Sequence, residues 1–169
     1  ADKGGLAIPY REFLIIQLIS IIGFAIFIPI SGWLADKYGR RTQQLWTTIA
    51  MAVFGLCFGP LISPAVVGTG ANVDTVAVTV FIFIGMCLMG LSFGSMSAYL
   101  PELYPTNVRY TASGIAYNVA SILGAALTPF VAVWLNSSYG VAAVGGYLAF
   151  ASILSVVFIL LTHETRDVD

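Results

Sequence analysis

This chain of 169 residues is 59% hydrophobic and only 9% charged, with a formal net charge of −1. Soluble domains carry about 25% charged residues, so a soluble fold would have more apolar side chains than its interior could hold. The composition therefore predicts a polytopic membrane protein surrounded by membrane lipid, and the absence of a basic region gives no support for nucleic-acid binding.

Apolar runs follow one another along the whole chain, and each is near or above the roughly 20 residues that a helix needs to cross a bilayer. None shows the two-residue alternation of a membrane β-strand. We therefore expect an all-α membrane protein with five transmembrane helices. The expected spans are residues 13–34, 45–62, 76–100, 111–135 and 141–162.

The segments between these runs alternate in charge. The segments after the second and fourth runs contain no base, whereas those after the first, third and fifth runs contain Lys37, Arg40, Arg41, Arg109 and Arg166. The positive-inside rule predicts that these bases are cytoplasmic. We therefore expect a multi-pass protein of the plasma membrane (in bacteria, the inner membrane), with the N-terminus outside and the C-terminus in the cytoplasm.

Small residues recur at a spacing of four in the third and fourth runs, which lets helices approach closely in lipid. One such stripe contains Gly90, Gly94 and Ala98, and the other contains Ala112, Ala116, Ala120, Gly124 and Thr128. The second and fifth runs show no comparable polar stripe. We expect them to be supporting helices that face lipid.

Polar and aromatic residues occupy other faces of the first, third and fourth runs. Serine can satisfy itself by bonding to its own helix backbone or to another helix. A buried amide is harder to satisfy in hydrocarbon, so a wet cavity is an alternative explanation for Gln17 and Asn118. The residues predicted to line a cavity are Gln17, Ser95, Tyr99, Tyr117, Asn118 and Ser121.

Three polar motifs carry a resemblance to a known family. The segment Gly32-x-Leu34-x-Asp36-Lys37-x-Gly39-Arg40-Arg41 resembles the signature loop of the major facilitator superfamily. The segment Glu102-x-Tyr104-Pro105-x-x-x-Arg109 is similar to the loop after helix ten of its sugar and metabolite transporters. The third motif, Glu164-Thr165-Arg166, resembles the segment after helix twelve, although His163 replaces the usual proline.

The run from Tyr104 to Tyr110, followed by Ser121-Ile122-Leu123-Gly124, is most similar to the metabolite:proton symporter branch. The resemblance implies that the five spans are helices eight to twelve, and so form most of the C-terminal six-helix bundle of a twelve-helix transporter. It also implies that the partner is an N-terminal transporter half missing from this sequence. The implied activity is secondary active transport, with proton-coupled symport of a small metabolite such as an organic acid or osmolyte.

The same motifs predict a conformational latch at the cytoplasmic side. Gly39 permits a turn that a Cβ would strain, and Asp36 can lie against the positive end of a neighbouring helix. Exposed ion pairs contribute only ~0–1 kcal/mol each, which is too little to hold the fold together. They are better suited to shifting an equilibrium between two conformations. An alternative is that these charges only orient the protein in the membrane. This explanation suits Lys37 and Arg166, but it leaves the acidic residues unexplained, because orientation requires only bases. The latch residues are Gly32, Asp36, Gly39, Arg40, Arg41, Glu102, Arg109 and Glu164.

No Asp, Glu, Lys, Arg or His lies well inside any apolar run, so the titrating group of a proton symporter is expected in the missing half. No nucleophile–base set, metal cluster or phosphate loop is present, so we expect no enzyme activity, metal or cofactor. The alternatives are a non-transporting membrane scaffold, which would not need acids in its cytoplasmic loops, and a channel, for which no filter-like motif is present.

Overall fold

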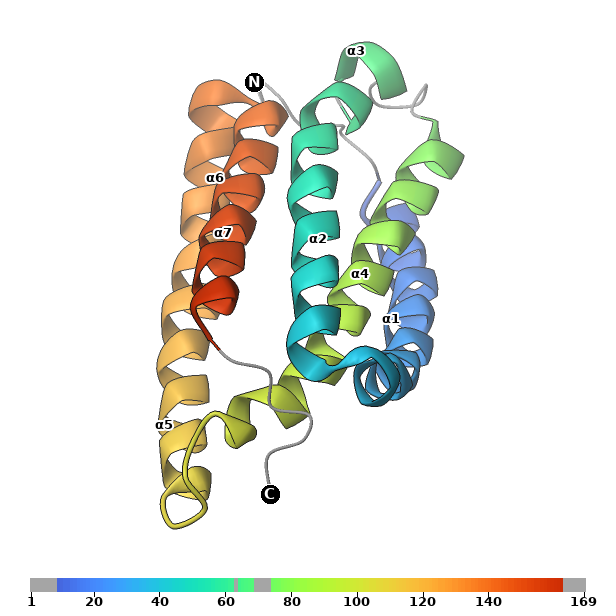
Figure 1. The fold of residues 1–169 in the computed structure, drawn as a ribbon. Coiled ribbons are helices and arrows are strands. Elements are labelled where there is room, and N and C mark those ends of the chain that lie inside the picture. Colours follow the sequence, from blue (N-terminus) through green and yellow to red (C-terminus); the bar gives the residue numbers. More distant parts are fainter. Residues whose placement is uncertain (1–8, 63, 69–73, 163–169) are drawn as a thin grey trace.

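The computed structural model describes residues 9–62, 64–68 and 74–162. These residues form helices without any strand, and five helical segments are long and apolar enough to cross a membrane. This confirms the predicted all-α fold with five transmembrane helices (Figure 1). The elements are α1 (Tyr10–Tyr38), α2 (Arg40–Ile62), the short α3 (Pro64–Val67), α4 (Thr75–Glu102), α5 (Arg109–Ser121), the π-helix η2 (Ile122–Ala126), α6 (Leu127–Tyr139) and α7 (Val141–Leu161).

The turn between α1 and α2 is a single residue. Gly39 adopts a φ of +97°, which only glycine tolerates well, and its N–H donates to the carbonyl of Ala35 at 3.0 Å. The helices therefore extend through most of the expected loop. The motif from Gly32 to Lys37 forms the last turns of α1, while Arg40 and Arg41 begin α2.

Helix α4 packs along α1 at a stripe of small residues. A Cβ on Gly90 would lie 2.6 Å from the carbonyl oxygen of Phe24, and one on Gly94 would collide with the carbonyl oxygen of Ile28. The hydroxyl of Ser31 also donates to the carbonyl of Leu91 in α4. The predicted close packing of the Gly90 and Gly94 stripe is confirmed, and its partner is α1.

Helices α2 and α7 form a second close pair. A Cβ on Gly55 would lie 2.8 Å from the backbone nitrogen of Ala149, and one on Gly59 would lie 2.8 Å from the Cβ of Ala142. Helix α2 also stacks Phe54 on Phe81 of α4, with ring centroids 4.3 Å apart. The expectation of a supporting, lipid-facing helix is therefore wrong for the second span. The fifth span, α7, packs on α2 and α6 but leaves many large apolar side chains exposed, as expected of a helix that faces lipid.

The second span also has a polar side that the sequence analysis did not recognise. Gln43, Thr47 and Thr48 are buried in α2, and Gln44 is half-buried. Two signals were present in the sequence: the Gly55-x-x-x-Gly59 spacing and the run of polar residues that opens the helix. Helix α2 contacts α1, α4 and α7, so it lies inside the bundle.

The fourth span contributes no buried residue, although it is 31 residues long. Its α6 half contacts α7 and its α5 half contacts α4, with η2 between them (Figure 1). The small-residue stripe predicted on this span is half-buried at Ala112 and Ala116 and exposed from Ala120 onward. A Cβ on Gly124 would meet no described atom within 4 Å. The described part of the chain therefore leaves most of this stripe uncovered.

Replacing Gly90 with alanine is expected to destabilise the protein. The new methyl group would meet backbone atoms of α1, and overpacking of this kind costs about 1–3 kcal/mol. The matched control is Gly146→Ala in α7, where a Cβ has open space, so we expect no loss. Thermal unfolding of the purified protein in detergent would measure both variants, and equal stability would contradict the close α1–α4 contact.

Candidate functional site

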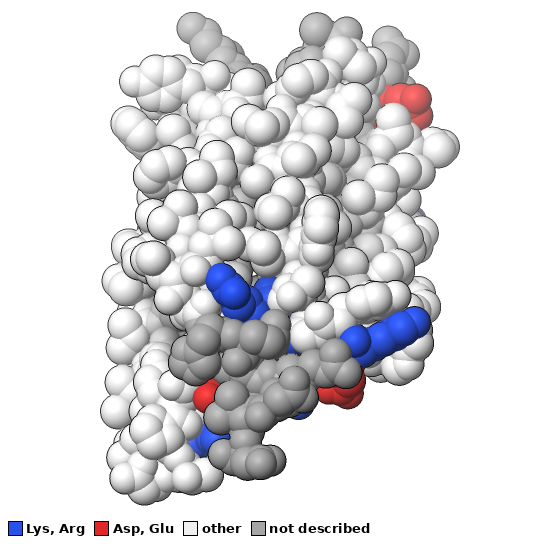
Figure 2. All heavy atoms as spheres, viewed as in Figure 1, with Lys and Arg blue, Asp and Glu red and all other residues white. Residues whose placement is uncertain are grey.

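Charged side chains gather at one end of the bundle, where α1 and α4 end and α2 and α5 begin (Figures 1 and 2). Of the charged residues that the structure describes, Arg11, Glu12 and Asp74 belong to the first turn of α1 and to the N-cap of α4. We call the remaining set the charged end; it consists of Asp36, Lys37, Arg40, Arg41, Glu102 and Arg109.

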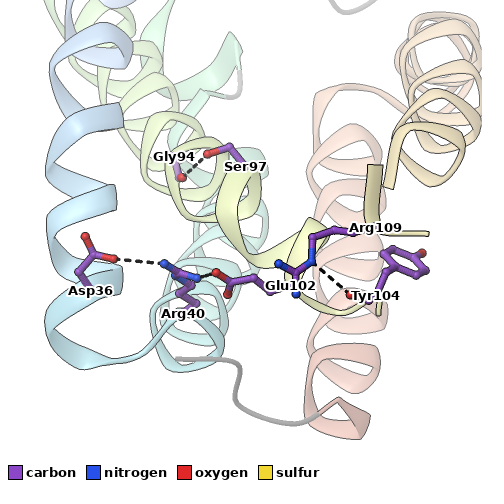
Figure 3. A network of polar contacts seen from close by, with 7 residues as sticks. All are labelled: Asp36, Arg40, Gly94, Ser97, Glu102, Tyr104 and Arg109. Carbon is purple, nitrogen blue, oxygen red and sulfur yellow. Dashed lines mark hydrogen bonds and ion pairs between the residues drawn. The ribbon is translucent and has the colours of Figure 1, made fainter. Parts of the chain in front are cut away.

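Arg40 joins three helices at the charged end (Figure 3). It forms an ion pair with Glu102 at the end of α4, and its Nη2 lies 3.6 Å from Oδ1 of Asp36 in α1. The Arg40 and Glu102 side chains are each 23% exposed, whereas Asp36 is 73% exposed. The structure therefore brings together three predicted latch residues, of which the Asp36 side chain remains largely exposed.

Arg41 contacts the far end of the chain. Its Nε donates to the carbonyl of Ile159 at 3.1 Å, and its Nη2 donates to the carbonyl of Leu160 at 2.9 Å. Carbonyls in the last turn of a helix lack intrahelical partners and carry partial negative charge. Arg41 therefore caps α7 and ties it to the start of α2, a contact that the sequence analysis did not anticipate.

Arg109 holds the connection between α4 and α5. Its Nε donates to the carbonyl of Tyr104 at 3.3 Å, and it forms no ion pair within the described part of the chain (Figure 3). A Cβ on Gly32, another predicted latch residue, would meet no described atom within 4 Å, so no helix described here packs closely against it. Glu164, the remaining predicted latch residue, lies outside the described residues.

Lys37 lies near two aromatic rings. Its Nζ is 5.0 Å from the ring centroid of Trp33 and 5.1 Å from that of Tyr38. Trp33 and Tyr38 are more than half exposed, as expected for side chains at a membrane–water interface. This arrangement fits the interpretation of Lys37 as a topological anchor.

A cavity of about 740 Å³ opens between the second half of α4 and α5. Apolar and aromatic side chains form most of its wall, with a few hydroxyl and amide groups among them. Its lining residues are Phe93, Met96, Ser97, Leu100, Pro101, Tyr110, Thr111, Ser113, Gly114, Ile115, Tyr117, Asn118, Val119 and Ile122. The amide nitrogen of Asn118 donates to the carbonyl of Gly114 at 2.7 Å, which orients the side chain on α5.

The structure distributes the predicted cavity residues over three places. Tyr117 and Asn118 line the α4–α5 cavity, whereas Ser121 and Gln17 are exposed and are not among its lining residues. Ser95 and Tyr99 are buried on another side of α4. Ser95 donates to Oε1 of Gln44 at 2.6 Å, and the Tyr99 hydroxyl contacts that of Thr162.

Sequence reasoning missed the contribution of α4 to the cavity. Phe93 and Ser97 lie four residues apart, as do Met96 and Leu100, so both pairs lie on one side of the helix. The spacing was visible in the sequence, but nothing there indicated that this side meets α5. In the described part of the chain, no group of three or more His, Cys, Asp or Glu side chains could hold a metal ion.

Comparison with known proteins gives one family. The family model of the Major Facilitator Superfamily matches residues 5–168. The inner membrane metabolite transport protein YhjE of Escherichia coli is 45% identical over 163 residues, which cover 96% of this chain and 35% of the relative. No solved structure matches the chain significantly.

More distant relatives include the proline/betaine transporter of Escherichia coli. It is 29% identical over 158 residues, covering 90% of this chain and 29% of the relative. The glycine betaine/proline/ectoine/pipecolic acid transporter OusA of Dickeya dadantii has the same identity and coverage. The chain therefore spans about a third of the length of the curated relatives that it matches.

The two ion pairs of Arg40 are expected to differ in strength. Arg40 and Glu102 are both largely shielded, so a double-mutant cycle with alanine should give a coupling free energy above about 1 kcal/mol. The pair with the exposed Asp36 should give about 0.3–0.5 kcal/mol, as for a surface pair of helix residues four apart. Thermal unfolding of the single and double variants would measure both energies, and a stronger Asp36 coupling would contradict this geometry.

Proposed function

The chain belongs to the major facilitator superfamily, and we propose that the full-length protein is a secondary active transporter that carries a small metabolite by proton-coupled symport. The observation that carries this proposal is the combination of a charged end on three helices with an open cavity between α4 and α5. The named relatives, which are an inner membrane metabolite transport protein and a proline/betaine transporter, support transport as the activity.

The proposed substrate is an organic acid or an osmolyte such as a betaine. The cavity offers aromatic rings together with the amide of Asn118 and hydroxyls such as that of Ser113. Such a lining suits a small solute whose charges are balanced internally, because rings attract a quaternary ammonium group and polar groups can bind a carboxylate. None of the residues lining the cavity carries a formal charge. A substrate with a net charge would therefore need a countercharge from the rest of the protein.

Proton coupling requires a titrating group on the transport path. No Asp, Glu, Lys, Arg or His lies in the interior of the described spans, where proton relays of transporters usually lie. We therefore assign the titrating carboxylate to the remaining part of the protein, which for the relatives is about two thirds of the chain.

The charged end is proposed to be a cytoplasmic latch that favours the outward-facing state. Alternating access rocks two bundles about a central site, so contacts made in only one state bias the equilibrium. A bias of a few kcal/mol is enough to shift the two populations by factors of ten to a thousand. The exposed carboxylate of Asp36 and the open space beside Gly32 lie on the end of α1, and both would face the N-terminal bundle. In this proposal the charged end lies in the cytoplasm, and the start of α1 lies on the outer side of the membrane.

A non-transporting scaffold is the alternative. The uncovered small-residue stripe on the fourth span would then be an interface between identical chains. The acids at the charged end favour the transporter, because a scaffold needs bases for orientation but has no use for Asp36 and Glu102.

Uptake by the full-length protein in proteoliposomes tests the function itself. Labelled organic acids and betaines would be offered with an imposed proton gradient. We expect accumulation of at least one of these solutes, and a proton uncoupler should abolish it. Accumulation that withstands the uncoupler would contradict proton coupling, and no uptake of any solute class would favour the scaffold.

Changing the latch should impair transport without preventing expression. Asp36→Asn removes the charge of the exposed carboxylate, and Arg109→Ala removes the contact with the Tyr104 carbonyl. We expect each variant to lower the uptake rate by about tenfold, the effect of a ~1.4 kcal/mol change in the balance of states. Glu12→Gln, in the first turn of α1, is the matched control and should transport normally. Normal uptake by both latch variants would refute the latch.

Changing the cavity should weaken substrate binding. Asn118→Ala removes one polar group from the α4–α5 cavity, and the loss of one hydrogen bond should raise KM about threefold to tenfold. Ser137→Ala in α6 is the control, because Ser137 is exposed and bonds to its own helix. Concentration-dependent uptake would measure KM. An unchanged KM would remove Asn118 from the substrate site.

A further inference from the structure

A polar contact joins the polar start of α2 to the apolar second half of α4. The Gln44 amide nitrogen donates to the hydroxyl of Ser92 at 3.0 Å, and the Ser95 hydroxyl donates to Oε1 of Gln44 at 2.6 Å. Ser95 is fully buried, with 0% exposure. One side chain of α2 therefore uses its donor and its acceptor on two successive positions along the same face of α4.

The neighbouring glutamine behaves differently. The amide nitrogen of Gln43 donates to the hydroxyl of Thr47 in its own helix at 3.2 Å. Ser95 could also satisfy itself within α4, but its distances to the carbonyls of Leu91 and Ser92 are 3.2 and 3.3 Å, longer than the distance to Gln44. The contact between helices is therefore a specific feature of Gln44.

The contact lies on the side of α4 that faces α2. Arg40 and Gln44 are four residues apart on α2, and Ser95 and Glu102 are seven residues apart on α4, so the ion pair and the amide contact share one face of each helix. Gly90 and Gly94 face α1, whereas Phe93 and Ser97 line the cavity. A small rotation of α4 would therefore change which side chains the cavity presents.

We propose that Gln44 is a positioning residue: its amide holds α4 in the rotation that presents the side of Phe93, Met96 and Ser97 to the cavity. Gln44 is not among the residues that line the cavity, so it acts through Ser92 and Ser95. Its effect on transport rests on the proposed function, whereas its effect on the rotation of α4 does not.

The rotation can be measured by labelling one cysteine in the full-length protein. Ser97→Cys places a thiol on the cavity wall, in a background where Cys57, Cys87 and any other cysteine are alanine. The rate of its reaction with a membrane-permeant maleimide would be compared with and without Gln44→Leu. Leucine is more apolar than glutamine, so the variant should insert normally. Gln43→Leu is the matched control, and Ser95→Ala removes the same contact from the side of α4.

We expect Gln44→Leu and Ser95→Ala each to change the labelling rate by about threefold or more, and Gln43→Leu to change it by less. In the double variant of Gln44→Leu and Ser95→Ala, the labelling rate should change no more than in the more affected single variant, because the two residues share one contact. KM for the transported solute should rise in the same two variants, and the labelling result stands even if no solute is found. Equal labelling in all variants, or an equal change in Gln43→Leu, would overturn the proposal. If the Gln44→Leu variant does not insert into the membrane, the labelling rate of the Ser95→Ala variant alone tests the proposal.

Discussion

The backbone contact between α1 and α4 is the constraint on which the rest of the bundle depends. Lipid offers no hydrophobic drive for helices to associate, so close packing and hydrogen bonds must hold them together. Gly90 and Gly94 let α4 lie against the carbonyls of α1, which directs its remaining sides toward α2 and toward the cavity. The same helix therefore serves as a packing surface, as a partner of Arg40 and as a cavity wall.

The charged end adds long-range links to this packing. Arg40 joins α2 to α4, and Arg41 joins α2 to the last turn of α7, so two adjacent residues connect segments far apart in the sequence. These contacts are polar and lie at the end of the bundle, where water can replace them at modest cost. Glycine packing thus supplies the permanent structure, whereas the charged end is suited to contacts that form in one state and break in another.

The sequence predicted features that depend on local spacing. The five spans, the turn at Gly39 and the Gly90 and Gly94 stripe all follow from length, glycine chemistry or helical periodicity. Contacts such as Arg41 with Ile159 and Gln44 with Ser95 join residues 118 and 51 positions apart, and no local pattern indicates them. For the cavity, Tyr117 and Asn118 could be named because they lie on a polar face, but Phe93 could not, since its role depends on where α5 lies.

If the proposed transporter is correct, a second bundle should cover the fourth span, which the described residues leave exposed, together with the end of α1 that carries Asp36. A small diazirine-bearing amino acid at position 120, which is exposed in the structure, would test this in the full-length protein. Mass spectrometry after irradiation would identify what lies beside it. We predict cross-links to the proposed N-terminal bundle. Adducts with lipid alone would contradict the claim, because they would show that no second bundle covers the fourth span.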